Sequence, residues 1–316
     1  MLIEAFQQSI HVVEVICIRA APVIFVVALL QEYGFLRYIE SFAGKVVKRT
    51  AFGMETGKAF IANAGSAYAG GGILVDMYRK GRISRANLVL SVVFAGFPAY
   101  VRVLITSVGP VAFTLLPFPV ALFYVCFSLG SGICNTLVAG ALSHRFVKAD
   151  NKISAESKNN VAEPRTIPKD HLRIIKAALK QSARYSIKMA IYVTVITSVV
   201  FYFEKAGLFQ RLPFGVGFLG LPEKFNVVLF SYIGNSYAGM GIMGEMMRNG
   251  MLPTAVAIKL LTFCMLCSRP VVALLEAPAY YFGFFGFRSG LAIMLFTLST
   301  FSILATAALI VMLFFF

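Results

Sequence analysis

The stretches GSAYAGGGILVDMYRKG (residues 65–81) and GNSYAGMGIMGEMMRNG (residues 234–250) are nearly the same seventeen residues, written 169 positions apart. Nine aligned positions are identical, and the acid Asp76 aligns with Glu245. Chance would give about one match, and self-similarity at a fixed offset is the signature of a repeated unit. The flanks agree, because each copy precedes a short turn and two long apolar stretches. The sequence therefore predicts two internal repeats.

The composition is that of a membrane protein. Hydrophobic residues make up 59% of the 316 positions and charged residues only 14%, whereas soluble domains carry about 25% charged residues. Stretches of about 20 apolar residues are long enough to cross a bilayer as helices. We therefore predict an all-α, polytopic protein of the cell membrane with about eight transmembrane helices. The predicted spans are 10–32, 57–78, 86–108, 118–143, 185–204, 225–247, 254–276 and 288–315.

The basic charge predicts the domain organisation and the orientation. The net charge is +15, and the positive-inside rule explains it without nucleic acid, for which the chain has no soluble basic domain. Membrane repeat 1 is predicted at 1–147 and repeat 2 at 183–316. A cytoplasmic linker with a basic amphipathic helix is predicted between them, at 148–182. The basic turn 79–85 lies two spans before this linker, so both are expected in the cytoplasm.

Eight spans also place the N- and C-termini in the cytoplasm. The segment between the first two spans contradicts the positive-inside rule, because its basic residues would lie outside. Four spans in each half favour parallel repeats. Inverted repeats would need an odd number of spans, which a third, shorter crossing within 86–146 would supply.

The glycines predict either an interrupted helix or close helix packing. Gly65, Ala69, Gly72 and Asp76 follow one another at steps of four, three and four, so they share one helix face. Each glycine costs about 1 kcal/mol relative to alanine inside a helix in water. The Gly-rich helices are therefore candidates for breaks inside the membrane, where freed backbone groups would line a cavity. The alternative is that small residues only allow helices to pack tightly.

Polar side chains beside the glycines predict a substrate site. Unpaired amides and hydroxyls cost several kcal/mol in hydrocarbon, so they need partners there. Two clusters from two repeats would together form one polar site at the midplane. The predicted substrate-binding residues are Asn63, Ser66, Tyr68 and Gly72 in the first copy, Asn235, Ser236, Tyr237 and Gly241 in the second, and Arg269.

Charged residues within or beside the spans are candidates for gating or ion coupling. Arg269 is the deepest of them, and it is expected either to hold an anionic group or to form an internal ion pair. For charged side chains near helix ends, the alternative interpretation is an interfacial ion pair or an arginine that reaches the headgroups. The predicted ion or gating residues are Asp76 with Arg79, Glu245 with Arg248, Arg102 and Glu276.

No catalytic, metal or cofactor site is predicted. The three histidines, His11, His144 and His171, are scattered, and the Cys264–Cys267 pair lacks the further ligands that a metal site needs. Paired catalytic acids are also missing. We therefore expect a protein that is not an enzyme and has no cofactor.

The two Gly-rich copies resemble the nucleoside recognition (Gate) domain. That domain also occurs in concentrative nucleoside transporters, in the membrane region of ferrous iron transport protein B and in spore maturation proteins A and B. The resemblance covers about 15–145 and 185–315 and is sharpest at 60–81 and 229–250. It implies a transporter-like core in which paired Gly-rich helices shape the pathway. The GTPase of the iron transporters is not expected, since the sequence has no P-loop.

These observations predict a transporter or permease for a small polar solute, nucleoside-like or ionic. A channel, a lipid-handling protein and a structural subunit of a membrane complex remain as alternatives. Membrane lipids and the solute are the expected partners. A second copy of the chain or a second membrane subunit stays open as a protein partner, and nucleic acid is excluded.

Overall fold

The computed structural model describes residues 54–65, 67–147, 171–207, 215–275 and 277–315, together with Phe52 and isolated positions between 6 and 29. Throughout these residues every regular element is a helix, which confirms the all-α prediction. Four helical stretches are long and apolar enough to cross a bilayer: Arg85–Leu115, Phe118–Phe146, Thr254–Leu274 and Phe287–Phe314. They correspond to four of the eight predicted spans and are compatible with a membrane protein. The predicted span 10–32 lies almost wholly outside the described residues.

The first of these stretches is continuous but irregular. It consists of α5 (Arg85–Ala95), α6 (Phe97–Val103), a π-helical turn at Leu104–Val108 and α7 (Gly109–Leu115). The π turn comes directly before Pro110, whose missing N–H leaves a carbonyl of the preceding turn without its usual donor. The chain reverses only at Leu116, which is extended, before α8 (Phe118–Phe146) begins. The stretch 86–146 therefore forms two long helical stretches, and no separate helix corresponds to the third crossing considered from its prolines.

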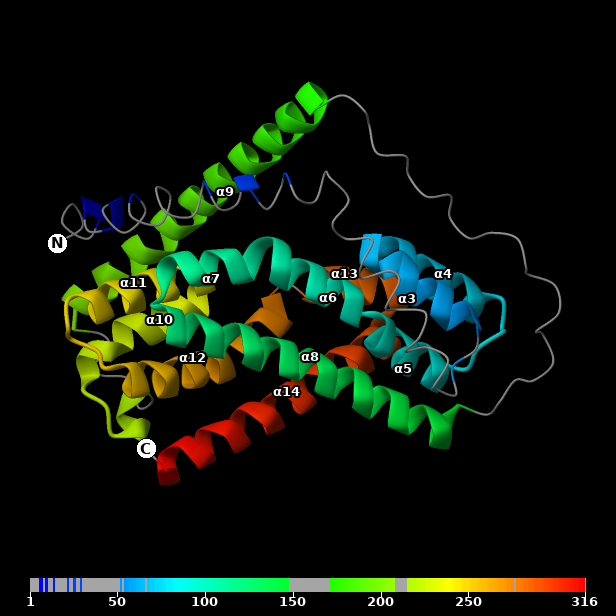
Figure 1. The fold of residues 1–316 in the computed structure, drawn as a ribbon. Coiled ribbons are helices and arrows are strands. Elements are labelled where there is room, and N and C mark those ends of the chain that lie inside the picture. Colours follow the sequence, from blue (N-terminus) through cyan, green and yellow to red (C-terminus); the bar gives the residue numbers. More distant parts are fainter. Residues whose placement is uncertain are drawn as a thin grey trace.

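The two Gly-rich segments are helical hairpins. The prediction of continuous helices over 57–78 and 225–247 is wrong, whereas the predicted interruption is confirmed. The first segment forms α3 (Met54–Gly65) and α4 (Ala67–Arg79), and the second forms α10 (Asn226–Gly234) and α11 (Ser236–Arg248). In each pair the two helices lie side by side (Figure 1). At 1.5 Å per residue these arms are about 14–20 Å long, too short to cross a hydrocarbon core of about 30 Å.

Glycine allows the two arms of each hairpin to touch. A Cβ added at Gly70 would overlap the side chain of Asn63, and one added at Gly239 would lie 2.8 Å from the backbone nitrogen of Tyr232. Residues 63 and 70 of the first copy align with residues 232 and 239 of the second, so the same two positions make the contact in both copies. The expected close approach at Gly72 is wrong, because a Cβ there would have no neighbour within 4 Å. The glycine two positions earlier makes the contact.

Asn235 ends one helix of the second hairpin and begins the next. Its extended backbone (φ −157°, ψ 122°) breaks the helix, and its side-chain Oδ1 accepts hydrogen bonds from the amides of Tyr237 (2.9 Å) and Ala238 (3.3 Å). This is the usual role of asparagine at a helix N-terminus, where the first amides have no partner inside the helix. The predicted substrate ligand Asn235 is therefore the cap of α11.

The remaining helices repeat the same bounds at the same offset. Shifted by 169 residues, α4 coincides with α11, and α8 coincides with α14 (Phe287–Phe315). Likewise, α5 begins at Arg85 and α12 (Thr254–Leu275) begins at Thr254. A short helix, α13 (Ala277–Phe285), precedes α14 as α7 precedes α8.

The hairpins lie at opposite ends of the molecule (Figure 1). The turn that joins α4 to α5 is at one outer edge, and the turn that joins α11 to α12 is at the other. The closed tips of both hairpins, after Gly65 and Gly234, consequently face inward. Each hairpin packs against helices of its own half and one helix of the other half: α4 contacts α13, and α11 contacts α7.

The predicted amphipathic helix and the predicted span 185–204 form one helix, α9 (His171–Lys205). It begins within the predicted linker 148–182 and continues across the proposed boundary at 183. Its 35 residues correspond to about 52 Å. Exposed apolar side chains recur along its length, including Leu172, Ile175, Leu179, Ile187, Ile191 and Val195. So many exposed apolar side chains on one helix are unusual in a water-soluble monomer.

Candidate functional site

A cavity of about 270 Å³ lies between α5, α6, α8, α12, α13 and α14. Both halves of the chain therefore contribute to its wall. Most of the lining is apolar, as in most small-molecule sites, where a few polar groups fix the orientation of the ligand. The polar lining residues include Tyr100, Ser131, Asn135, Thr136, Arg269 and Tyr281.

Irregular helix geometry forms part of this wall. Gly96, which lines the cavity, separates α5 from α6, and Pro98 follows two residues later. Pro270 lies inside α12, directly after Arg269. Proline lacks the backbone N–H that would close the preceding helical turn, so both sites loosen the backbone hydrogen bonds beside the cavity. Irregular backbone is tolerated at membrane depth where it lines a cavity.

Arg269 is the basic residue of the cavity wall. Its guanidinium carbon lies over the Phe301 ring, 4.4 Å from the ring centre, in a cation–π contact. No carboxylate of the described residues lies within 4.0 Å of this guanidinium. The ring supplies no acceptor oxygen for the N–H donors of Arg269, and this side chain lines the cavity.

Three hydroxyl groups of the wall donate to backbone carbonyls. Tyr100 donates to the backbone oxygen of Ser128 (3.0 Å), and Ser131 donates to the same oxygen (2.7 Å). Thr136 donates to the carbonyl of Gly132 (2.9 Å). These bonds, one between helices and two within α8, satisfy the hydroxyl protons. The guanidinium of Arg269 is consequently the strongest donor that the described wall offers to a ligand.

A further contact connects α8 with α14 beside the cavity. The side chains of Asn135 and Thr300 form a hydrogen bond. Phe301, under Arg269, occupies the position 169 residues after Gly132, and Arg269 itself occupies the position 169 residues after Tyr100. A Cβ at Gly132 would lie 2.8 Å from the Tyr100 ring. The same pair of positions is therefore in contact in both halves, with a tyrosine in one half and a cation in the other.

Asn63 lies beside the cavity and does not line it. Its amide nitrogen donates to the carbonyl oxygen of Ala95 (2.7 Å), directly before the Gly96 bend. The side chain is only 5% exposed, and its Oδ1 has no hydrogen-bond partner among the described residues. Asn63 thus connects the first hairpin to the bend that forms the cavity wall.

The other predicted substrate residues do not meet in one cluster. Ser66 lies outside the described residues, and Tyr68 belongs to the first turn of α4. Ser236 begins α11, Tyr237 packs against the apolar core, and Gly241 is buried within α11. The described members of the two sets belong to hairpins at opposite ends of the molecule. Of the predicted substrate residues that the structure describes, Arg269 alone lines the cavity.

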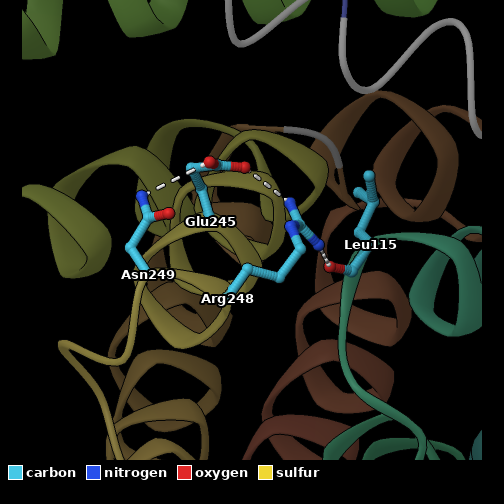
Figure 2. Close-up of polar contacts among 4 residues, drawn as sticks. All are labelled: Leu115, Glu245, Arg248 and Asn249. Carbon is cyan, nitrogen blue, oxygen red and sulfur yellow. Dashed lines mark hydrogen bonds and ion pairs between the residues drawn. The ribbon is translucent and has the colours of Figure 1, made fainter.

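Glu245 and Arg248 join α11 to the end of α7 (Figure 2). Arg248 pairs with Glu245 at 2.8 Å and donates to the carbonyl oxygen of Leu115 at 3.1 Å. Asn249 also approaches Glu245, at 3.4 Å. The last carbonyls of a helix lack intrahelical partners, so the arginine caps α7. We name this group of residues, with Gly244, whose added Cβ would overlap the Leu115 oxygen, the α7–α11 contact.

The first copy lacks this arrangement. Asp76 pairs with Lys80 at 2.6 Å, where both side chains are more than half exposed, and Arg79 is also exposed. The expected pairing of Asp76 with Arg79 is therefore wrong, and such exposed pairs contribute little. Arg102 is half-buried in α6, and Glu276 lies outside the described residues. Among the described residues, no group of three or more His, Cys, Asp or Glu side chains is arranged to hold a metal ion.

Sequence reasoning missed Tyr100, Asn135 and Phe301. Each is an ordinary residue within an apolar helix, and only the fold brings them to one wall. The sequence does contain one indication of Tyr100, because this residue lies 169 positions before Arg269 and so occupies the equivalent position of the first copy. Gly70 and Gly239 were visible as identical positions, but helical spacing drew attention to Gly72 and Gly241 instead.

Comparison with known proteins gives one finding for most of the chain. It is 26% identical over 286 residues to an uncharacterized protein of Methanocaldococcus jannaschii, covering 86% of this chain and 85% of that protein. No family model matches the chain. No solved structure matches it.

Proposed function

We propose that the protein is a secondary transporter built from two inverted repeats, with the cavity between them as its solute site. The observation that carries the proposal is the pair of inward-pointing hairpins, which enter from opposite ends and share element bounds at one offset. Inverted repeats around a site formed by interrupted helices are a common plan of secondary transporters. The resemblance of the Gly-rich copies to the nucleoside recognition domain supports the same class.

The hairpins change the number of crossings. A hairpin returns to the side from which it entered, so each repeat has three spans and not four. The scheme contains six spans: 10–32, 85–115, 118–146, α9, 254–275 and 287–315. Three is an odd number, so the second repeat has the opposite orientation to the first. This replaces the parallel arrangement favoured by counting eight spans.

The basic residues agree with the inverted arrangement. The segment 33–58, the turn 79–85 and the linker 147–170 now lie on one side of the membrane, and all three are rich in Lys and Arg. The positive-inside rule makes this side the cytoplasm. The contradiction at 33–58 disappears, and the N- and C-termini are placed outside.

The same plan gives the cavity two exits. The hairpin tips point from opposite ends toward the helices that form its wall. Asn63 connects one hairpin to the wall at Ala95, and the α7–α11 contact holds the other hairpin against α7. Movement of one hairpin at a time would open the cavity to one side and then to the other, which is alternating access.

Cysteine labelling tests this function without a known solute. In a variant whose five native cysteines are replaced, Ala273→Cys places a thiol on the cavity wall. A membrane-impermeant thiol reagent is expected to label it both from outside in intact cells and from inside in inverted vesicles. Ala257→Cys, in the same helix but fully buried, is the matched control and should stay unlabelled. Labelling of Ala273→Cys from one side only would contradict alternating access.

A further inference from the structure

We infer that the cavity binds a small monocarboxylate with an apolar body, held by Arg269. This inference rests on the proposed function and names the substrate class of the same site. It follows from three features of the cavity, namely its single described cation, its apolar walls and the engaged hydroxyls.

The first feature is the charge of Arg269. An arginine at membrane depth is costly unless a negative group or a water-filled space accompanies it. Within the described part of the chain no carboxylate reaches its guanidinium, and the Phe301 ring supplies only a cation–π contact. An anionic ligand in the cavity would complete the neutralisation. The planar guanidinium is suited to a carboxylate, which it binds through two parallel N–H···O bonds.

The second feature is the apolar remainder of the wall. Val92, Phe97, Val272, Ile293 and Leu298 line the space around Arg269. Burial of apolar ligand surface against such side chains is favourable. A divalent anion such as hydrogen phosphate would bring a second charge for which the described wall offers no cation. One charge and an apolar body therefore match the cavity better than a polyanion does.

The third feature distinguishes an anion from a neutral polar solute. The hydroxyl protons of Tyr100, Ser131 and Thr136 are donated to backbone carbonyls. A neutral amide or sugar needs both donors and acceptors from the wall, whereas a carboxylate needs donors only. The guanidinium supplies donors and no acceptor. The hydroxyl oxygens can still accept, so the carboxylate is favoured over its neutral amide analogue by the charge-assisted bond from the guanidinium, which is about twice as strong as a neutral one.

Binding of matched acid and amide probes tests the inference on the purified protein in detergent. Benzoate and hexanoate are compared with benzamide, hexanamide and inorganic phosphate by isothermal titration calorimetry. The acids are expected to bind about 10- to 100-fold more tightly than their amides, as a charge-assisted contact implies. Equal affinity of acid and amide, tighter binding of phosphate, or no binding by either acid overturns the inference.

Variants of Arg269 locate the effect. Arg269→Gln is expected to remove the preference for acid over amide, and Arg269→Lys to retain part of it through charge alone. Arg102→Gln is the matched control, since Arg102 is also a half-buried arginine of a membrane helix but does not line the cavity. A preference that survives Arg269→Gln overturns the inference.

A measurement on the wild-type protein does not depend on whether the variants fold. Phenylglyoxal modifies accessible guanidinium groups, and mass spectrometry identifies the modified residue. Benzoate is expected to protect Arg269, and benzamide is expected not to. Modification of Arg269 that benzoate leaves unchanged contradicts the inference. Competition by palmitate distinguishes the source of the acid: displacement of benzoate by palmitate indicates a lipid-derived acid, and displacement only by short acids indicates a soluble one.

The two proposals fail separately. If Ala273→Cys is labelled from both sides but acids bind no better than amides, transport stands and the substrate class is wrong. If acids bind through Arg269 but the cavity opens to one side only, the site stands and the transport function is wrong.

Discussion

Replacement of Gly239 by leucine is expected to prevent folding of the second hairpin. The added Cβ would lie 2.8 Å from the backbone nitrogen of Tyr232, and the backbone of a packed helix cannot move aside as a side-chain end can. Tyr232 is itself only 4% exposed, so the arm has no free space behind it. Overpacking of this kind costs about 1–3 kcal/mol and more where backbone must shift. Yield of monodisperse protein in detergent and its thermal unfolding measure the effect.

The first hairpin supplies the matched pair of variants. Gly70→Leu is expected to behave like Gly239→Leu, because its Cβ would overlap Asn63. Gly72→Leu, two positions along the same helix, points into open space and should be tolerated. Gly72→Ala should raise stability by up to about 1 kcal/mol through helix propensity. Normal folding of both Gly70→Leu and Gly239→Leu would show that the hairpin arms are not in contact.

Replacement of Gly244 by valine is expected to open the α7–α11 contact. Its Cβ would overlap the carbonyl oxygen of Leu115, so α11 must move away from α7 and Arg248 must lose its 3.1 Å bond to that oxygen. The position 169 residues earlier is Val75, so the first half of the chain has a valine where the second half has this glycine. We therefore expect a folded protein whose second hairpin is displaced outward.

Cavity labelling measures that displacement. In the Ala273→Cys background, Gly244→Val is expected to raise the labelling rate from the outer side about tenfold or more, the effect of weakening a closed state by about 1.4 kcal/mol. Arg248→Gln, which removes the cap and the pair with Glu245 but adds no volume, should give a smaller increase in the same direction. Labelling that stays at the wild-type rate in both variants would show that the α7–α11 contact does not close the outer exit.

The sequence predicted the helices better than their arrangement. Apolar length placed 86–108, 118–143, 254–276 and 288–315 within a few residues of observed helix bounds or inside them. It failed at Gly65 and Gly234, because the hydropathy of a hairpin resembles that of a single span. In the proposed scheme, one uncounted reversal in each half changes the parity of the crossings, which is why counting eight spans favours the parallel arrangement.

The candidate site was predictable only in part. Arg269 was identified because a charge within an apolar stretch is conspicuous in any membrane protein. Tyr100 and Phe301 were not, since an aromatic residue in an apolar helix carries no signal until the fold brings it to a cavity. Asn63 and Asn235 were recognised as polar residues that need partners. Their partners are backbone groups, the Ala95 carbonyl and the first amides of α11, which spacing along the sequence does not indicate.

The inverted arrangement is tested most directly by the sidedness of two equivalent turns. Arg82 follows α4 and Met251, 169 residues later, follows α11, and both are exposed. In the chain with its native cysteines replaced, we predict that Arg82→Cys reacts with an impermeant thiol reagent only in inverted vesicles. Met251→Cys should react only in intact cells. Reaction of both positions from the same side would contradict inverted repeats and restore the parallel arrangement.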